Sequence, residues 1–197
     1  MSRKNAIVWC VDCNERYNAM ALHSMFCARE HDRISDFFML TLKTNTYAKL
    51  YEMLTKTKVV FVDDLYERHF KHLHSAIHDT MISSFAYCRL LVLGIDMFMQ
   101  YEKVLYLDCD SIVKMPIEDL FSMQLCSSSI KIMMVPEIAT DGYNLKLLKH
   151  FCKRHGFMYD AAQYGNSGVA LFVMQNIEAA DYENALKLAK FKFPIQD

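Results

Sequence analysis

Apolar residues gather in six short runs along the chain, each bounded by polar or turn-forming residues. The runs are four to seven residues long, which is the usual length of a buried strand. They cover Ala6–Val11, Phe37–Leu42, Val59–Val62, Val104–Leu107, Ile130–Val135 and Gly168–Met174. The pattern therefore predicts six strands.

Longer stretches between several of these runs place apolar residues at helical spacing. They cover Asn18–Arg29, Thr46–Thr55 and Ser75–Met99. Parallel strands need crossover helices and are covered on both faces, so this alternation predicts an α/β fold: a three-layer α/β/α sandwich with a mixed, mostly parallel sheet. Because repeats, low-complexity segments and linker-like stretches are lacking, we expect one domain over residues 1–197.

Two aspartates follow the fourth run, in the stretch VLYLDCDSIV. Asp108 and Asp110 are two residues apart, so in a continuing strand their side chains would share one face and could bind one hard cation. Ligands of parallel sheets bind at the carboxyl ends of the strands, which is where this pair lies. The alternative is that both residues cap a turn before a helix around Glu118–Phe121.

Polar residues also border the first and last strands. After the first, Asp12 and Asn14 can hydrogen-bond a nucleobase or ribose and Tyr17 can stack on a base; a polar helix cap with Tyr17 in the core is the alternative. Before the last, Asn166 can bind hydroxyls and Gly168 permits close approach of a ligand to the backbone; a plain turn is the alternative there.

Composition narrows the function classes. With 22 Lys and Arg against 23 Asp and Glu, the net charge of −1 does not indicate a nucleic-acid binder. The N-terminal apolar run of about six residues is too short for a signal sequence or a membrane span.

The seven cysteines, with one weak C-x-x-C at Cys10 and Cys13, indicate reduced thiols rather than disulfides or zinc. The pair His74 and His78 is expected to be structural or solvent-facing.

Four stretches in the same order resemble the glycogenin-like, or family 8, glycosyltransferases of the GT-A fold. They are IVWCVDCNERY, SSFAYCRLLV, EKVLYLDCDSIV and YGNSGVALF, and the third is similar to the family's E-K-V-L-Y-L-D-x-D motif. The resemblance covers roughly residues 6–197.

This resemblance implies transfer of a hexose from a UDP-sugar, such as UDP-glucose or UDP-galactose, to a glycan or protein acceptor, with retention of configuration. It assigns Mn²⁺ or Mg²⁺ to Asp108 and Asp110, and uridine contacts to Asp12, Asn14 and Tyr17. It also assigns the donor sugar or diphosphate to Arg89, and the sugar to Asn166 and Gly168. The resemblance makes Asn166 and Asp197 the candidate catalytic residues. Asp197 lies where the family has the aspartate of a D-Q pair.

The sequence stops at PIQD, before the family's later His-x-x-Gly segment, whose histidine is the third metal ligand. We therefore expect a domain of a longer protein with an incomplete metal site. Because the sequence predicts no membrane anchor and reduced cysteines, we expect a cytoplasmic location in a bacterium or a virus-infected host cell. Two other functions stay open: a non-catalytic nucleotide-sugar-binding module, and a metal-dependent nucleotidyltransferase or phosphohydrolase. A glycine-rich phosphate loop, which would favour the last, is absent from the sequence.

Overall fold

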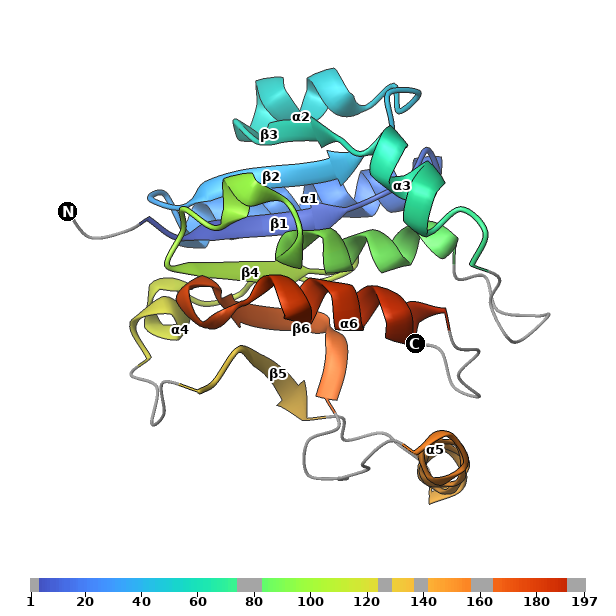
Figure 1. The fold of residues 1–197 in the computed structure, drawn as a ribbon. Helices are drawn as coiled ribbons and strands as arrows, with labels where there is room; N and C mark the ends of the chain where they lie inside the picture. The colour runs from blue at the N-terminus through green and yellow to red at the C-terminus, as the bar shows by residue number, and fades with distance from the viewer. Residues whose placement is uncertain (1–3, 74–82, 124–128, 137–141, 157–164, 191–197) are drawn as a thin grey trace.

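The structure, a computed structural model, describes residues 4–73, 83–123, 129–136, 142–156 and 165–190 (Figure 1). One six-stranded sheet forms its centre, and helices lie on both sides of it. The elements in chain order are β1 (Ala6–Cys10), α1 (Glu15–His31), β2 (Asp36–Thr41), α2 (Ala48–Thr55), β3 (Lys58–Phe61), α3 (Asp63–His69), the 3₁₀ segments η1 (Ser84–Leu93) and η2 (Asp96–Phe98), β4 (Lys103–Leu107), α4 (Glu118–Ser122), β5 (Ile132–Pro136), α5 (Gly142–His155), β6 (Gly165–Val173), η4 (Met174–Asn176) and α6 (Ala179–Ala189).

The strand order in the sheet is β3-β2-β1-β4-β6-β5. Strands β1, β2, β3 and β4 pair in parallel, whereas β6 runs antiparallel to both of its neighbours, β4 and β5. This confirms the predicted α/β fold with a mixed, mostly parallel sheet. The reversed direction of β6 also brings its first residues to the edge where β1 and β4 end.

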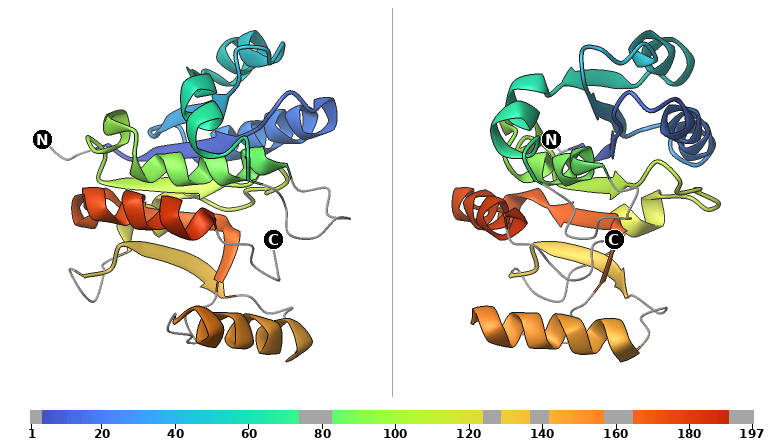
Figure 2. Two further views of the ribbon diagram at one scale, coloured as in Figure 1. Left: turned by 45° about the vertical axis from the view of Figure 1, so that its right-hand side comes forward. Right: turned by 90° about the vertical axis from the view of Figure 1, so that its right-hand side faces the viewer.

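The core forms two layers, one on each face of the sheet, because successive residues of a buried strand point to opposite faces. On one face, Val8 and Tyr106 belong to a cluster that includes residues of η1. On the other face, Trp9 and Leu105 belong to a cluster that includes residues of α1 and α2. Figure 2 shows the helices on both sides of the sheet, which gives the expected three-layer sandwich.

All six predicted strands are present, and most of their ends fall within two residues of the prediction. The exception is β6, which begins at Gly165, so Asn166 and Gly168 lie inside the strand rather than opening it. Helices α3, α5 and α6 were not predicted from the apolar pattern.

The predicted long helix over Ser75–Met99 is wrong in its described part. Residues 75–82 lie outside the described residues, and the remainder consists of η1 and η2, separated by a turn at Gly94. The amide of Gly94 donates to the carbonyl of Leu91 at 3.0 Å, and a Cβ atom at Gly94 would lie 2.3 Å from the Tyr182 ring of α6. The close packing of α6 therefore leaves no room for a side chain at position 94, where the chain turns.

No helix in the described ranges combines the length and apolarity that a bilayer crossing requires.

Candidate functional site

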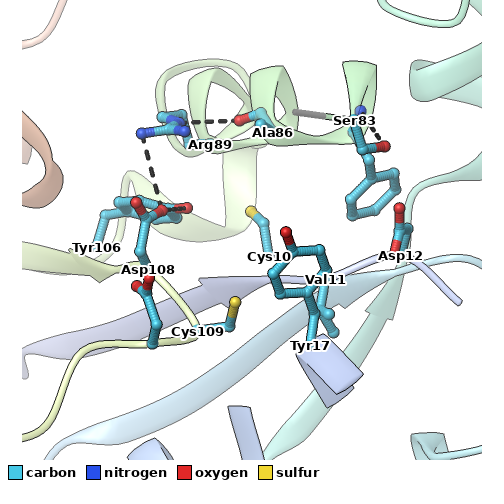
Figure 3. Close-up of a pocket in the computed structure, with 12 residues that line it drawn as sticks. Cys10, Val11, Asp12, Tyr17, Ser83, Ala86, Arg89, Tyr106, Asp108 and Cys109 are labelled. Carbon is cyan, nitrogen blue, oxygen red and sulfur yellow. Dashed lines mark hydrogen bonds and ion pairs between the residues drawn. The ribbon is translucent and has the colours of Figure 1, made fainter. Parts of the chain in front are cut away.

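A hollow of about 210 Å³ opens at the carboxyl edge of β1 and β4 (Figure 3). Of the residues predicted from the sequence, it brings together Asp12, Tyr17, Arg89, Asp108 and Asp110. The other lining residues are Cys10, Val11, Ser83, Phe85, Ala86, Tyr106 and Cys109. Figure 3 shows Asp12 on the opposite side of the hollow from Asp108, with Arg89 above Asp108.

Strand direction explains why residues far apart in sequence meet here. Strands β1 and β4 are adjacent and parallel, so Asp12 and Asp108 follow their ends at the same edge of the sheet. Because β6 is antiparallel to β4, its first residues reach that edge as well. The amide of Asp108 donates to the carbonyl of Gly168 at 2.7 Å, which anchors the aspartate loop to β6.

Arg89 is a cation held by three segments of the chain. Its Nε donates to the carbonyl of Ala86 at 2.9 Å, and its Nη1 donates to Oγ of Ser167 at 2.7 Å. The same Nη1 lies 3.8 Å from Oδ1 of Asp108, and the side chain of Arg89 is only 16% exposed. Burial acts to lower the pKa of Arg89, but the fields of Tyr106 and Asp108 outweigh it and the pKa is raised, so the charge is retained.

Tyr106 lies beneath this cation and orients Asp108. Its hydroxyl donates to Oδ1 of Asp108, and its ring centroid is 5.4 Å from the guanidinium carbon of Arg89. Burial raises the pKa of Tyr106, and the neighbouring Cys10 and Asp108 add to the effect against the opposing field of Arg89. Tyr106 therefore stays protonated and serves as a hydrogen-bond donor to the carboxylate.

The loop between β1 and α1 is fixed by a buried network of amides. Asn18, which is fully buried, donates from Nδ2 to the carbonyls of Asp12 at 2.8 Å and Asn14 at 2.7 Å. Its Oδ1 accepts from Nδ2 of Asn45 at 2.7 Å and from the hydroxyl of Tyr51. Because these groups are paired away from water, the network holds the backbone of the loop that carries Asp12.

Asn14 is the N-cap of α1. Its Oδ1 accepts from the amides of Arg16 at 3.0 Å and Tyr17 at 3.3 Å, and its own amide donates to Oδ1 of Asp12 at 2.9 Å. The cap is the alternative that the sequence left open for this residue, and Asn14 is not among the residues that line the hollow. A uridine contact by Asn14 stays a prediction, and it would use the amide nitrogen of the side chain.

The two aspartates lie in a turn and not in a continuing strand. Strand β4 ends at Leu107, and the amide of Ser111 donates to the carbonyl of Asp108 at 3.0 Å. The alternative predicted a turn before the helix around Glu118–Phe121, and the turn is present; α4 itself begins later, with Ile117 as its N-cap and no capping side-chain bond. Both carboxylates instead line the hollow, Asp110 as an exposed residue and Asp108 as a half-buried one.

Asp108 and Asp110 offer some of the ligands of a divalent metal ion but not a complete set. Carboxylate oxygens are the ligands that Mg²⁺ and Mn²⁺ prefer. No group of three His, Cys, Asp or Glu side chains suited to a metal occurs within the described part of the chain. The two aspartates could hold a divalent cation together with further ligands, such as the oxygens of a bound diphosphate.

Two thiols also face the hollow, and burial keeps both in the neutral form. Burial raises the pKa of Cys10, and burial together with Asp110 and Asp108 raises the pKa of Cys109 to about 11. A nucleophilic or metal-binding cysteine needs a lowered pKa, so these thiols act as ordinary lining groups.

Two of the predicted site residues lie beyond what the structure describes. The backbone of Asn166 belongs to β6, but its side chain is not described, and Asp197 lies outside the described residues. Conversely, Tyr106 and Ser167 were not predicted as site residues, although Tyr106 binds Asp108 and Ser167 binds Arg89. Tyr106 could have been found from its spacing, because it is two residues before Asp108 in the same strand stretch. For Ser167, the only indication in the sequence was its place in the N-S-G-V stretch.

The fold is similar to those of solved glycosyltransferases. The apo bifunctional glycosyltransferase WbbM has a TM-score of 0.61 at 15% identity, with 96% of this chain and 34% of that chain covered. An active-site mutant of LgtC has a TM-score of 0.60 at 19% identity, with 92% and 64% covered. Glucosyl-3-phosphoglycerate synthase from Mycobacterium tuberculosis, solved with Mn²⁺, UDP and glucosyl-3-phosphoglycerate, has a TM-score of 0.51 at 10% identity, with 88% and 57% covered.

These likenesses confirm the expected GT-A fold, and the chain spans between about a third and two thirds of the length of the three proteins. No curated protein matches the sequence. The model of the family described as glycosyl transferase family 8 matches residues 12–189. The chain therefore belongs to glycosyl transferase family 8.

Proposed function

We propose that this protein is a metal-dependent, retaining glycosyltransferase that transfers a hexose from a UDP-sugar to a hydroxyl group of a glycan or protein acceptor. The observation that carries the proposal is the meeting of Asp108, Asp110 and Arg89 at one hollow, in a chain of glycosyl transferase family 8. Retention, the hexose and the uridine base follow from the family resemblance. The mycobacterial synthase, which binds Mn²⁺ and UDP on a similar fold, supports the metal and the nucleotide.

The chemistry explains why both signs of charge meet in this hollow. During transfer, the bond between the anomeric carbon and the diphosphate oxygen breaks, and a bond to the acceptor oxygen forms as the acceptor loses its proton. The leaving UDP takes the electron pair, and a divalent cation bound by Asp108 and Asp110 would neutralise the charge that develops on it. Arg89 adds a fixed positive charge from the chain itself, held at 2.7 Å by Ser167.

The remaining residues take supporting roles in this proposal. Tyr17 offers a ring for the uracil base, Asp12 an acceptor for uridine, and Asn14 an amide at the loop. Gly168 places its backbone beside the aspartate loop through the 2.7 Å bond to Asp108. Asn166 would contact the transferred sugar, and Asp197 would act near the anomeric carbon.

A second candidate is a nucleotide-sugar-binding module without turnover. It is favoured by one observation: within the described ranges, no further His, Cys, Asp or Glu side chain joins Asp108 and Asp110 in a group suited to a metal ion. Such a module would bind UDP together with Mn²⁺ and release no UDP from UDP-sugars, even with acceptor present.

The test measures UDP release by the full chain from UDP-glucose and UDP-galactose, with and without Mn²⁺, with glycan acceptors and with water as acceptor. We expect metal-dependent release that Asp110→Asn reduces by at least about a hundredfold without loss of folding, since Asp110 is exposed. Asp119→Asn, at an exposed carboxylate of α4, is the matched control and should keep full activity. Metal-dependent UDP binding without release would select the second candidate, and absence of both would overturn the two together.

A further inference from the structure

Helix α5 carries a one-sided concentration of positive charge. Its fourteen residues include four of the 22 Lys and Arg residues of the chain and none of its 23 Asp and Glu residues. Because the whole chain has a net charge of −1, removing these four positive charges leaves −5 on all other residues. Helix α5 is therefore positively charged, whereas the other residues taken together carry a net negative charge.

The cationic residues share one side of the helix. At about 100° per residue, the positively charged Lys146, Lys149, Lys153 and Arg154, together with His150 between them, fall within an arc of about 140°. All five are exposed. In the described part of the chain, none of them forms an ion pair with a carboxylate.

The opposite side of α5 includes the less exposed residues of the helix. Cys152, on that side, is only 8% exposed, and Phe151 is half-buried. A partner that grips an amphipathic helix by its apolar face would need this side open. The cationic side is the one presented to solvent.

The position of α5 makes this side accessible to a large flat surface. Figures 1 and 2 show α5 at the periphery of the molecule, beyond β5 at the end of the sheet. The helix follows β5 and precedes β6, and β6 is antiparallel to both β4 and β5, so α5 lies at the edge of the sheet where β4 ends and the hollow opens.

We propose that α5 is an electrostatic docking helix that binds the protein to an anionic phospholipid membrane. Several Lys and Arg residues on one side of a peripheral helix are the usual means by which proteins bind anionic lipids reversibly, at about fivefold in affinity per cation. A nucleic acid is the weaker candidate, because the rest of the chain carries −5 and would repel a polyanion that extends past the helix. A membrane can be met by the protruding helix alone.

The test is cosedimentation of the full chain with two kinds of vesicle: phosphatidylcholine alone, and phosphatidylcholine with about 30% phosphatidylglycerol. UDP and metal are left out, so the result does not depend on the proposed transferase function. We expect binding to the anionic vesicles only, and weaker binding as salt shortens the screening length from about 10 Å at 0.1 M to about 3 Å at 1 M. Replacing Lys146, Lys149 and Lys153 by Gln should lower the partition coefficient on the order of a hundredfold.

The matched control replaces three exposed lysines elsewhere, Lys49, Lys187 and Lys190, by Gln, which removes the same charge and should change vesicle binding less than fivefold. Thermal unfolding of both triple variants checks that they fold. Equal binding of the two triple variants, equal binding to neutral and anionic vesicles, or tighter binding to duplex DNA than to anionic vesicles would overturn the proposal.

Discussion

The guanidinium of Arg89 lies 3.8 Å from the carboxylate of Asp108, at the point where η1, β4 and β6 meet. The cation is placed there by Ser167, which is 78 residues away in sequence, and by the carbonyl of Ala86 in its own segment. Two donors of one planar group are thus used for position, while the charge faces the hollow. This arrangement makes Arg89 sensitive to geometry as well as to charge.

Arg89→Lys should therefore lower kcat/KM for the UDP-sugar on the order of a hundredfold, although the charge is kept. A lysine ammonium is a compact group without the planar fork that bonds Ala86 and Ser167 at the same time, and a misplacement of about 1 Å at a reacting centre can cost this much. Steady-state kinetics of UDP release provides the measurement. Arg68→Lys, at an exposed arginine of α3, is the control, and equal kcat/KM for Arg89→Lys and the unmodified protein would refute the argument.

Tyr106→Phe should weaken metal binding in the presence of UDP by about 10-fold to 100-fold, because the hydroxyl that orients Asp108 is removed. Calorimetric titration with Mn²⁺ at saturating UDP measures the change. The loss of a hydrogen bond to a charged group should also lower the free energy of unfolding by about 1.5–3 kcal/mol.

Tyr101→Phe is the matched control for this effect. Its hydroxyl donates to Oδ2 of Asp36 at 2.8 Å, at the opposite edge of the sheet from the hollow. It should show a similar loss of stability with an unchanged affinity for Mn²⁺. A drop in metal affinity of the same size in both variants would mean that general destabilisation, and not the orientation of Asp108, is responsible.

The strands could be predicted because buried parallel strands leave continuous apolar runs, as in β1 and β4, where all five residues are buried. Helical spacing was less informative. The apolar residues of η1 recur at intervals that suit a 3₁₀ segment as well as an α-helix, and the turn at Gly94 depends on Tyr182 of α6, 88 residues later in the chain. Helix α6 begins with a reciprocal capping bond between Glu178 and Asp181, a local signal that the apolar pattern does not contain.

The charged residues of the site could also be predicted from the sequence, whereas the residues that hold them in position could not. Asp12 and Asp108 follow apolar runs, so their meeting required only that both strands be parallel neighbours. Asn18 and Asn45 hold the same loop, but they lie 27 residues apart in segments that no local pattern connects. The direction of β6, which brings Ser167 to Arg89, is likewise fixed by tertiary packing.

Asp36 should make the stability depend on pH in the acid range. Burial acts to raise the pKa of this carboxyl, but hydrogen bonds from Tyr101 and Lys58 outweigh it, and the pKa lies below the unfolded value of 3.8. A lowered pKa stabilises the folded state fully above the unfolded value, and this stabilisation is lost as the pH falls through the folded value. Urea unfolding from pH 6 to pH 2 should therefore show a smaller loss of stability below about pH 4 in Asp36→Asn than in the unmodified protein. Parallel curves for the two proteins would contradict this assignment.

Asn18→Asp tests whether the buried amide network supports nucleotide binding. The substitution keeps the shape of the side chain but replaces the Nδ2 donor by an acceptor, which would face the carbonyls of Asp12 and Asn14 at 2.7–2.8 Å. We expect the free energy of unfolding to fall by about 3 kcal/mol and the affinity for UDP to fall with it, because the loop that carries Asp12 and leads into α1 loses its anchor. Tyr51→Phe removes one donor to Oδ1 of Asn18 and leaves Asn45 in place, so it should cost about 1 kcal/mol and leave UDP affinity within twofold. Urea unfolding and calorimetry with UDP measure both quantities, and an equal loss of UDP affinity in the two variants would show that the anchor at Asp12 and Asn14 is not what holds the nucleotide loop.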